Sequence, residues 1–253
     1  MPEIEYFPVV LFVVSFVVLL VAAWAGTLAG RRYPLDEDMR TDFNVVLGAS
    51  LTFLALIIGF TFSMAASRYD QRKNLEEAEA NAIGTEYSRA LLLPSADASK
   101  IQTLLRWYLE LRTGFYVETD SQARRDNEAR TAKAQADLWA AVLPPAAAAP
   151  NPVVALVVAG MNDVLNSQSY TQAAFWNRIP VAAWNLIAAI ALCCCFMVGY
   201  GVKSQATARR LLLVFPLLVS VAMMFIADID SPRRGIIKIQ PQNLINLEQS
   251  LRR

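Results

Sequence analysis

Residues 45–66 read VVLGASLTFLALIIGFTFSMAA, and the chain runs on without a break into SRYDQRKNLEEAEANAIGTEYSRALLL at residues 67–93. The first stretch holds 22 residues and no charge, so as a helix it would span about 33 Å, enough for a bilayer core. The second stretch is charged, free of proline and rich in helix formers, and it would extend the same helix by about 40 Å. This pattern predicts a membrane bundle joined to a soluble domain, which suits a conduit or a scaffold better than an enzyme.

Four apolar runs without Lys, Arg, Asp or Glu predict the fold class. They cover residues 6–29, 45–66, 180–202 and 211–227, and each is near the length of about 20 residues that a spanning helix needs. Asp228 and Asp230 should lie at the end of the last run, because placing them within lipid is unfavourable. The leading residues are acidic, so we expect the first run to be an uncleaved membrane helix. The sequence therefore predicts an all-α protein with four transmembrane helices and a helical soluble insert between spans two and three.

The predicted organisation has four parts. Residues 1–66 hold transmembrane helices 1 and 2, residues 67–179 a soluble helical domain, residues 180–227 transmembrane helices 3 and 4, and residues 228–253 a tail. Within the insert, proline positions predict helices at about 67–93, 96–117, 121–142 and from 153 toward 176, with residues 144–152 (PPAAAAPNP) as a loop. Residues 30–43 and 203–210 are expected to be short polar connections.

The tail carries a pattern of its own at residues 242–251. Leu244, Leu247 and Leu251 recur on one face of a helix, while Asn243, Glu248 and Gln249 point elsewhere. We expect this amphipathic helix to dock on the soluble domain.

Composition excludes several functions. The chain has no histidine and three adjacent cysteines at 193–195, which excludes a His-based triad, zinc or haem and leaves no cofactor or metal to assign. Residues 68–150 hold eleven Lys or Arg and twelve Asp or Glu, so no basic face for nucleic acid is expected. Arg72 with Glu76 and Lys73 with Glu77 are interpreted as ordinary pairs on a solvated helix surface.

The second span has a stripe of small residues, which are Gly48, Thr52, Ala55, Gly59, Ser63 and Ala66. One interpretation is close helix packing, because small residues let backbones approach each other in lipid. The other is that this helix lines a narrow path with Leu56 and Phe60 as constrictions, since channels can gate by dewetting at apolar rings. Arg68, where the span meets water, is either an interfacial anchor or a pore-mouth charge that concentrates anions.

A family resemblance enters through two motifs. Gly59-Phe60, six residues, then Ser67-Arg68-Tyr69 is similar to the second-helix signature of bestrophin channels. More closely, EANAIGT at residues 79–85 and DIDSPRRG at residues 228–235 resemble the bestrophin-like family of membrane proteins. The four-span layout with a helical insert after span two fits the same family, so the resemblance covers most of the chain.

The resemblance implies a homo-oligomer, a pentamer in bestrophins, around a central pore lined by the second helix. It places the hydrophobic neck on Thr52, Leu56 and Phe60, of which Thr52 departs from the expected large aliphatic residue. It also implies that both termini and the helical insert are cytoplasmic. Lys and Arg near the spans divide seven against six between the two sides, which decides nothing. The calcium clasp of bestrophins needs a dense acidic run directly after the fourth span, where this chain has only Asp228 and Asp230, so calcium gating is not expected.

Two functions from different classes remain. The first is an oligomeric channel of the inner membrane with anions as the candidate permeant ions, Thr52, Leu56, Phe60 and Ser63 as pore candidates and Arg68 at the mouth. The second is a non-conducting membrane scaffold or envelope sensor whose helical domain binds a partner. Either would have copies of itself and the lipid bilayer as partners, and the first would also bind small inorganic ions.

Overall fold

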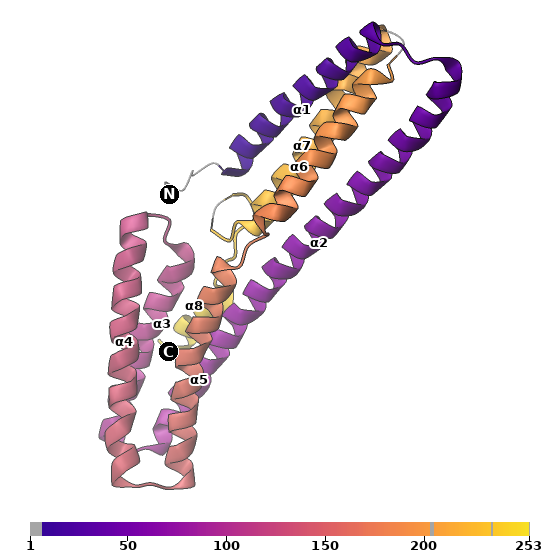
Figure 1. Cartoon of the computed structure of the whole chain (residues 1–253). Helices are drawn as coiled ribbons and strands as arrows, with labels where there is room; N and C mark the ends of the chain where they lie inside the picture. Colours follow the sequence, from indigo (N-terminus) through magenta and orange to yellow (C-terminus); the bar gives the residue numbers. More distant parts are fainter. Residues whose placement is uncertain (1–6, 203–204, 234, 253) are drawn as a thin grey trace. The chain divides into compact units, whose positions relative to one another are not determined.

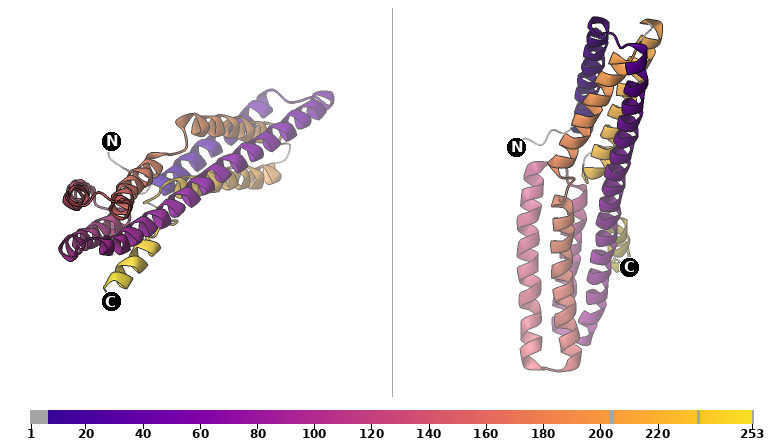
Figure 2. Two further views of the ribbon diagram at one scale, coloured as in Figure 1. Left: turned by 90° about the horizontal axis from the view of Figure 1, so that it is seen from below. Right: turned by 45° about the vertical axis from the view of Figure 1, so that its right-hand side comes forward.

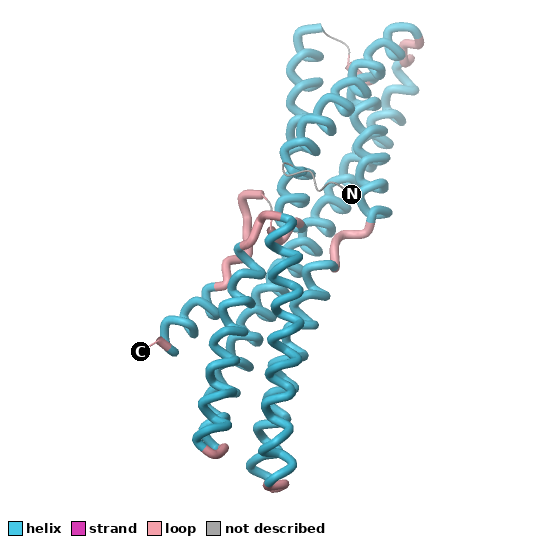
Figure 3. Tube along the Cα trace, turned by 90° about the vertical axis from the view of Figure 1, so that its left-hand side faces the viewer, coloured by secondary structure: helices cyan, strands magenta, loops and turns pink. Residues whose placement is uncertain are grey.

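A computed structural model describes residues 7–202, 205–233 and 235–252, and this part of the chain is helical with no strand (Figures 1 and 3). The helices follow the chain in this order: α1 (Phe7–Arg32), α2 (Glu37–Arg89), the 3-10 turn η1 (Ala90–Leu92), α3 (Ser95–Val117), α4 (Ser121–Ala148), α5 (Pro152–Trp176), α6 (Val181–Tyr200), α7 (Gln205–Asp230) and α8 (Gln242–Leu251).

Among the described residues, four helical stretches are long and apolar enough to cross a membrane by length and composition. They are Pro8–Arg32, Glu37–Leu92, Pro152–Tyr200 and Leu212–Asp230, and the third of them covers both α5 and α6. Each contains or largely overlaps one of the apolar runs in the sequence. The all-helical fold class and the four membrane candidates are thus present.

The chain divides into two compact units. Unit 1 comprises Met1–Arg68 and Arg178–Lys238, and unit 2 comprises Tyr69–Asn177 and Ile239–Arg253. Helix α2 contributes residues to both units, because it continues as one helix from Glu37 to Arg89.

The core of unit 1 forms where α1, α6 and α7 pack together with one side of α2. Its fully buried members include Leu19, Leu54, Ile187 and Cys194. Glycines set the spacing of α1 and α6 in this core. A Cβ added at Gly199 would lie 1.9 Å from the Ala23 carbonyl oxygen, and one at Gly26 would lie 2.0 Å from that of Phe196. The two backbones therefore approach more closely than any larger residue allows.

The small residues of α2 behave differently. A Cβ added at Gly48 or Gly59 would meet no atom within 4 Å, and Thr52, Ala55 and Ser63 are exposed. The interpretation that this stripe packs tightly against another helix is therefore wrong within the single chain. The close helix contact is formed instead by glycines of α1 and α6. In the sequence these glycines stand among large aliphatic residues and form no stripe of small residues.

Unit 2 packs the second part of α2 with α3, α4, α5 and α8, and Figure 2 shows the α4–α5 hairpin from two sides. The predicted loop at residues 144–152 is wrong for most of its length, because α4 continues through Pro144 and Pro145 to Ala148. Proline keeps a helical φ, and the alanines that follow favour the helix enough to offset the missing N–H groups. The turn shrinks to residues 149–151, where Asn151 Oδ1 accepts from Val153 N and Val154 N at 3.0 Å and caps α5.

Two connections are also shorter than expected. The polar link at residues 30–43 reduces to residues 33–36, because α1 runs to Arg32 and α2 begins at Glu37. The turn at residues 203–210 is replaced from Gln205 onward by the start of α7, while Lys203 and Ser204 lie outside the described residues. In both cases polar residues extend a helix beyond its apolar run.

We predict that Gly199→Ala destabilises unit 1 while Gly48→Ala does not. The methyl group at position 199 would overlap the Ala23 carbonyl, and relieving such overpacking costs on the order of 1–3 kcal/mol. Thermal unfolding of the two variants in the same detergent measures the difference. Equal midpoints for both variants would contradict this account of the α1–α6 crossing.

Candidate functional site

The second part of α2 carries charges that point into unit 2. Arg72, Glu76, Glu79 and Glu86 share one side of the helix with Ile83, and each of these charged residues is at most 1% exposed. The interpretation of Arg72 and Glu76 as a solvated surface pair is therefore wrong, whereas Lys73 and Glu77 are exposed as expected. The spacing of 72, 76, 79, 83 and 86 follows one helical face, which is the signal that could have revealed this buried stripe.

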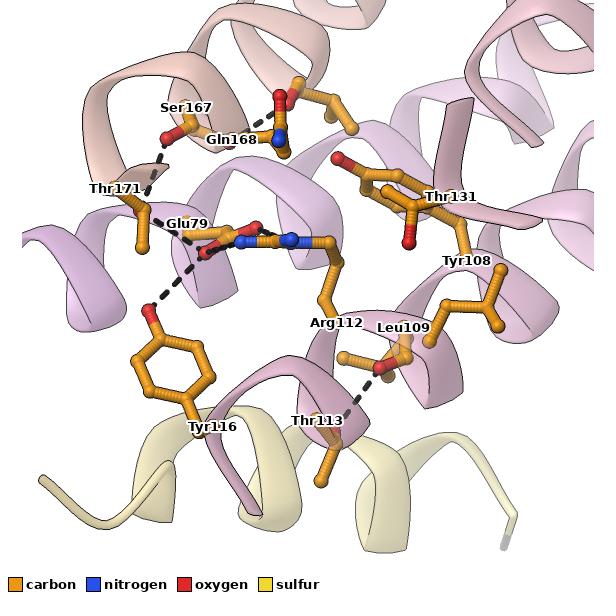
Figure 4. Close-up of polar contacts among 12 residues, drawn as sticks. Glu79, Tyr108, Leu109, Arg112, Thr113, Tyr116, Thr131, Ser167, Gln168 and Thr171 are labelled. Carbon is orange, nitrogen blue, oxygen red and sulfur yellow. Dashed lines mark hydrogen bonds and ion pairs between the residues drawn. The ribbon is translucent and has the colours of Figure 1, made fainter. Parts of the chain in front are cut away.

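Glu79 is the centre of a buried polar cluster (Figure 4). Its carboxylate forms an ion pair with Arg112 Nε of α3, and Arg112 Nη2 lies 3.4 Å from Glu79 Oε2. Tyr116 Oη and Thr171 Oγ1 donate to the same Oε2 at 3.3 and 3.1 Å. The Glu79 carboxylate of α2 thus binds side chains of both α3 and α5. These partners supply the hydrogen bonds that a buried charge requires.

The electrostatics of this cluster favour a fixed charge pair. Burial by itself lowers the pKa of Arg112, but the adjacent Glu79 carboxylate outweighs it and the pKa is raised. Burial, and next the negative charge of Glu79, raise the pKa of Tyr116, so its hydroxyl stays a donor. The guanidinium also lies 4.4 Å from the centre of the Phe115 ring, within reach of a cation–π contact.

Arg72 and Glu76 stabilise the ends of two other helices. Arg72 donates from Nε to the Ala174 carbonyl at 3.0 Å and from Nη2 to the Asn177 carbonyl at 2.9 Å, at the C-terminus of α5. Glu76 Oε1 accepts from Asn243 N and Leu244 N at 2.9 Å, at the N-terminus of α8. Each charge has the sign that the local helix dipole favours.

The tail helix α8 spans Gln242–Leu251, the residues expected from the sequence. Leu244 is fully buried in the core of unit 2, and Leu247 and Leu251 pack against that core. One detail differs from the expectation: the Asn243 side chain does not point elsewhere, because its Nδ2 donates to Glu76 Oε2 at 2.6 Å.

The DIDSPRRG motif shapes main chain in unit 1. Asp228 accepts from Ile236 N and Ile237 N at 2.9 Å, and Asp230 accepts from Ile179 N at 3.2 Å. Gly235 adopts a φ of +106°, and a Cβ there would lie 1.9 Å from Asp228 Oδ1. Only glycine suits this turn. The part of the chain that the structure describes contains no cluster of three acidic, Cys or His residues able to hold a metal.

The predicted pore residues lie on the outward side of α2 in unit 1. Leu56 and Phe60 are 50% and 62% exposed, and Thr52 and Ser63 are exposed beside them, whereas Leu54 on the opposite side is 2% exposed. The Thr52 hydroxyl donates to the Gly48 carbonyl at 2.9 Å, so its polar group is satisfied within the helix. The four residues therefore share one helical face.

Arg68 is the last residue of unit 1 on α2 and is half-buried. Its Nη2 lies 3.7 Å from Met64 Sδ, one turn earlier. The guanidinium thus stays close to its own helix at the end of the apolar stretch.

Comparison with known proteins identifies the family of this chain and solved structures with a similar fold. A family model of the Bestrophin-like domain matches residues 11–244. The chain belongs to the Bestrophin-like family. This Bestrophin-like protein also resembles solved structures at low sequence identity, and no curated protein matches it.

Three crystal structures illustrate the likeness. A bacterial Bestrophin homolog from Klebsiella pneumoniae aligns with a TM-score of 0.68 at 12% identity, covering 94% of this chain and 96% of its own. A mutated form of that homolog gives 0.67 at 12% identity, with 95% and 97% covered. A mutated membrane protein gives 0.69 at 12% identity, with 94% and 97% covered. At this identity the likeness concerns the fold.

We predict that Arg112→Met destabilises unit 2 by about 3–5 kcal/mol, because it leaves the buried Glu79 charge without its cation. Adding Glu79→Gln should recover part of the loss, since the amide oxygen still accepts from Tyr116 and Thr171. Chemical denaturation of the purified protein compares the single and double variants. A double variant less stable than Arg112→Met alone would contradict this account.

We also predict that Glu76→Ala loosens α8, because the N-terminus of that helix loses its cap. Limited proteolysis should cleave residues 242–251 faster than in the wild type. The matched control is Glu77→Ala, which removes the same group from an exposed position of the same helix. Equal cleavage rates in the two variants would show that Glu76 does not hold the tail.

Proposed function

We propose that this chain is a subunit of a homo-oligomeric ion channel in the cell's inner membrane, with a central pore lined by the apolar part of α2. The proposal rests on family membership and on one contrast within unit 1, between the outward faces of α1 and α2. It also takes the protein to be a channel rather than an enzyme.

The outward face of α1 consists of large side chains. The exposed ones are Val9, Val10, Val13, Val14, Val17, Val18, Val21, Trp24 and Leu28. Such a surface suits lipid, where large apolar groups are well accommodated. We therefore assign α1 to the lipid-facing side of the assembly.

The outward face of α2 mixes small and hydroxyl-bearing residues with a few bulky ones. Gly48, Thr52 and Ser63 are exposed there, and Phe60 is 62% exposed. Lipid gains little from small residues and hydroxyls, whereas a narrow aqueous path uses both. This contrast is the observation that carries the proposal.

Roles within the pore follow from side-chain chemistry. Leu56 and Phe60 would form apolar rings that close the path by dewetting. Thr52 and Ser63 would line wider sections on either side. A ring of Arg68 guanidinium groups at the mouth would concentrate anions, which favours anion conduction.

The proposed assembly and orientation rest on the resemblance to bestrophin channels. We propose a pentamer in which residues 1–66 and 180–227 span the membrane and residues 67–179 form a cytoplasmic helical domain, with the tail from 228 to 253 docked on it. The boundary between the first two parts falls close to Arg68, where unit 1 ends on α2.

Ion flux in reconstituted liposomes tests the proposal. Phe60→Ala should raise chloride flux above the wild type, because it widens the narrowest ring. The matched control is Phe62→Ala, since Phe62 lies on the same helix but borders a groove of about 620 Å³ toward α7. Its flux should stay at the wild-type level.

Two outcomes would overturn the channel. Liposomes that stay tight to chloride and potassium with both wild type and Phe60→Ala would leave the scaffold as the better function. A monomer by mass photometry in mild detergent would exclude a pore built from several copies of α2.

A further inference from the structure

Glu86 differs from the other buried charged residues of α2 because its carboxyl group has no hydrogen-bond partner among the described residues. Its side chain is 0% exposed, and neither carboxyl oxygen has a hydrogen-bond partner among the described residues. Ile83 and Ala90, one turn away on either side, belong to the apolar core of unit 2. A carboxylate in such a place is strongly disfavoured relative to the neutral acid.

The side chain of Glu86 lies against α5 at Gly160. A Cβ added to Gly160 would lie 2.0 Å from Glu86 Oε2 and 2.5 Å from Arg89 Nη1. The carboxyl group of Glu86 therefore lies directly against the α5 backbone at Gly160. No larger residue at position 160, and no water molecule, fits between them. Opening of this contact would let water reach the carboxyl group, so opening of the contact and ionisation of Glu86 favour each other.

We propose that Glu86 is a proton-binding site that controls the contact between α2 and α5: the protonated acid lets the helices pack at Gly160, and loss of the proton weakens that packing.

Burial and two neighbouring charged groups set the proton affinity of the site. Burial raises the pKa of Glu86 to about 8, while Arg89 on its own helix lowers it and Asp163, one turn beyond Gly160 on α5, raises it. The buried residues that α3 and α4 contribute to the core of unit 2 include Ile101, Leu105 and Leu138, which are apolar. The site therefore exchanges its proton close to physiological pH.

The sign of the pH effect follows from linkage. Between the ordinary range of a glutamic acid and about pH 8, the packed state keeps the proton and the opened state releases it. Opening of the α2–α5 contact is therefore favoured as pH rises through this interval, by up to about tenfold per pH unit for one proton. Above about pH 8 the packed state also loses the proton, and the pH dependence levels off.

Infrared difference spectroscopy and hydrogen–deuterium exchange of the intact purified protein test the site. The carboxylic C=O band of Glu86 should disappear with a midpoint near pH 8 in the wild type and be missing in Glu86→Gln. Amide protection of α2 and α5, corrected for the pH dependence of chemical exchange, should fall with pH in the wild type and stay constant in Glu86→Gln. Glu77→Gln, an exposed position of α2, should behave like the wild type.

Two neighbouring variants give shifts of opposite sign. Asp163→Asn removes a negative charge and should move the midpoint to lower pH, whereas Arg89→Gln removes a positive charge and should move it to higher pH. A midpoint in the ordinary carboxylic range, or the same pH dependence in Glu86→Gln as in the wild type, would overturn the proposal.

A link to conduction rests in addition on the proposed function. Because α2 carries the candidate pore face, chloride flux of the wild type should depend on pH across this interval and that of Glu86→Gln should not. Flux that is present but insensitive to pH in both would overturn the link alone, and absence of flux would overturn the channel. Neither affects the spectroscopic test of the proton site.

Discussion

The ion pair between Glu79 and Arg112 is the interaction around which unit 2 is built. One carboxylate holds a guanidinium from α3, a tyrosine hydroxyl from the same helix and a threonine hydroxyl from α5. Because a buried charge without partners is strongly disfavoured, these groups constrain α2, α3 and α5 to one arrangement. Arg72 and Glu76 extend the same logic to the end of α5 and the start of α8. Apolar packing alone would allow the helices to slide along one another. Hydrogen bonds to particular backbone carbonyl and amide groups prevent this sliding.

The same helix meets opposite requirements along its length. In unit 1, α2 buries Leu54 and turns Leu56 and Phe60 outward, so its apolar surface is available to lipid or to other copies of the chain. In unit 2 its Arg72, Glu76 and Glu79 point inward and are hydrogen-bonded there, while Lys73 and Glu77 are exposed. The helix therefore exposes apolar side chains in unit 1 and buries charged side chains in unit 2. An amphipathic helix of a soluble protein does the opposite, since it buries its apolar side chains and exposes its charged ones. This division is what makes α2 the element on which the proposed pore depends.

Much of the fold could be predicted because it depends on long, uniform features. The apolar runs predicted the four helices that are long and apolar enough to cross a membrane, proline positions predicted helix boundaries near residues 94 and 152, and the leucine spacing predicted α8. The two family motifs indicated the Bestrophin-like family before any geometry was known.

Features that depend on partners far away in the chain could not be predicted. Arg72 and Glu76 look like a surface pair in sequence, since their partners lie about 100 and 170 residues further on. The close approach at Gly199 likewise depends on Ala23 of another helix. The outward position of Thr52, Leu56, Phe60 and Ser63 agrees with a pore face, while their role stays a prediction.

Water access along α2 tests the central claim most directly. Single cysteines would be placed along residues 48–66 and at position 17 in a variant without the three native cysteines, and treated with a small, water-soluble thiol reagent in the intact membrane. We predict that positions 52 and 63 react, while position 54 in the core and position 17 on the outward face of α1 do not. Reaction at neither 52 nor 63, or equal reaction at 17 and 52, would show that this face of α2 meets lipid and that no aqueous path runs along it.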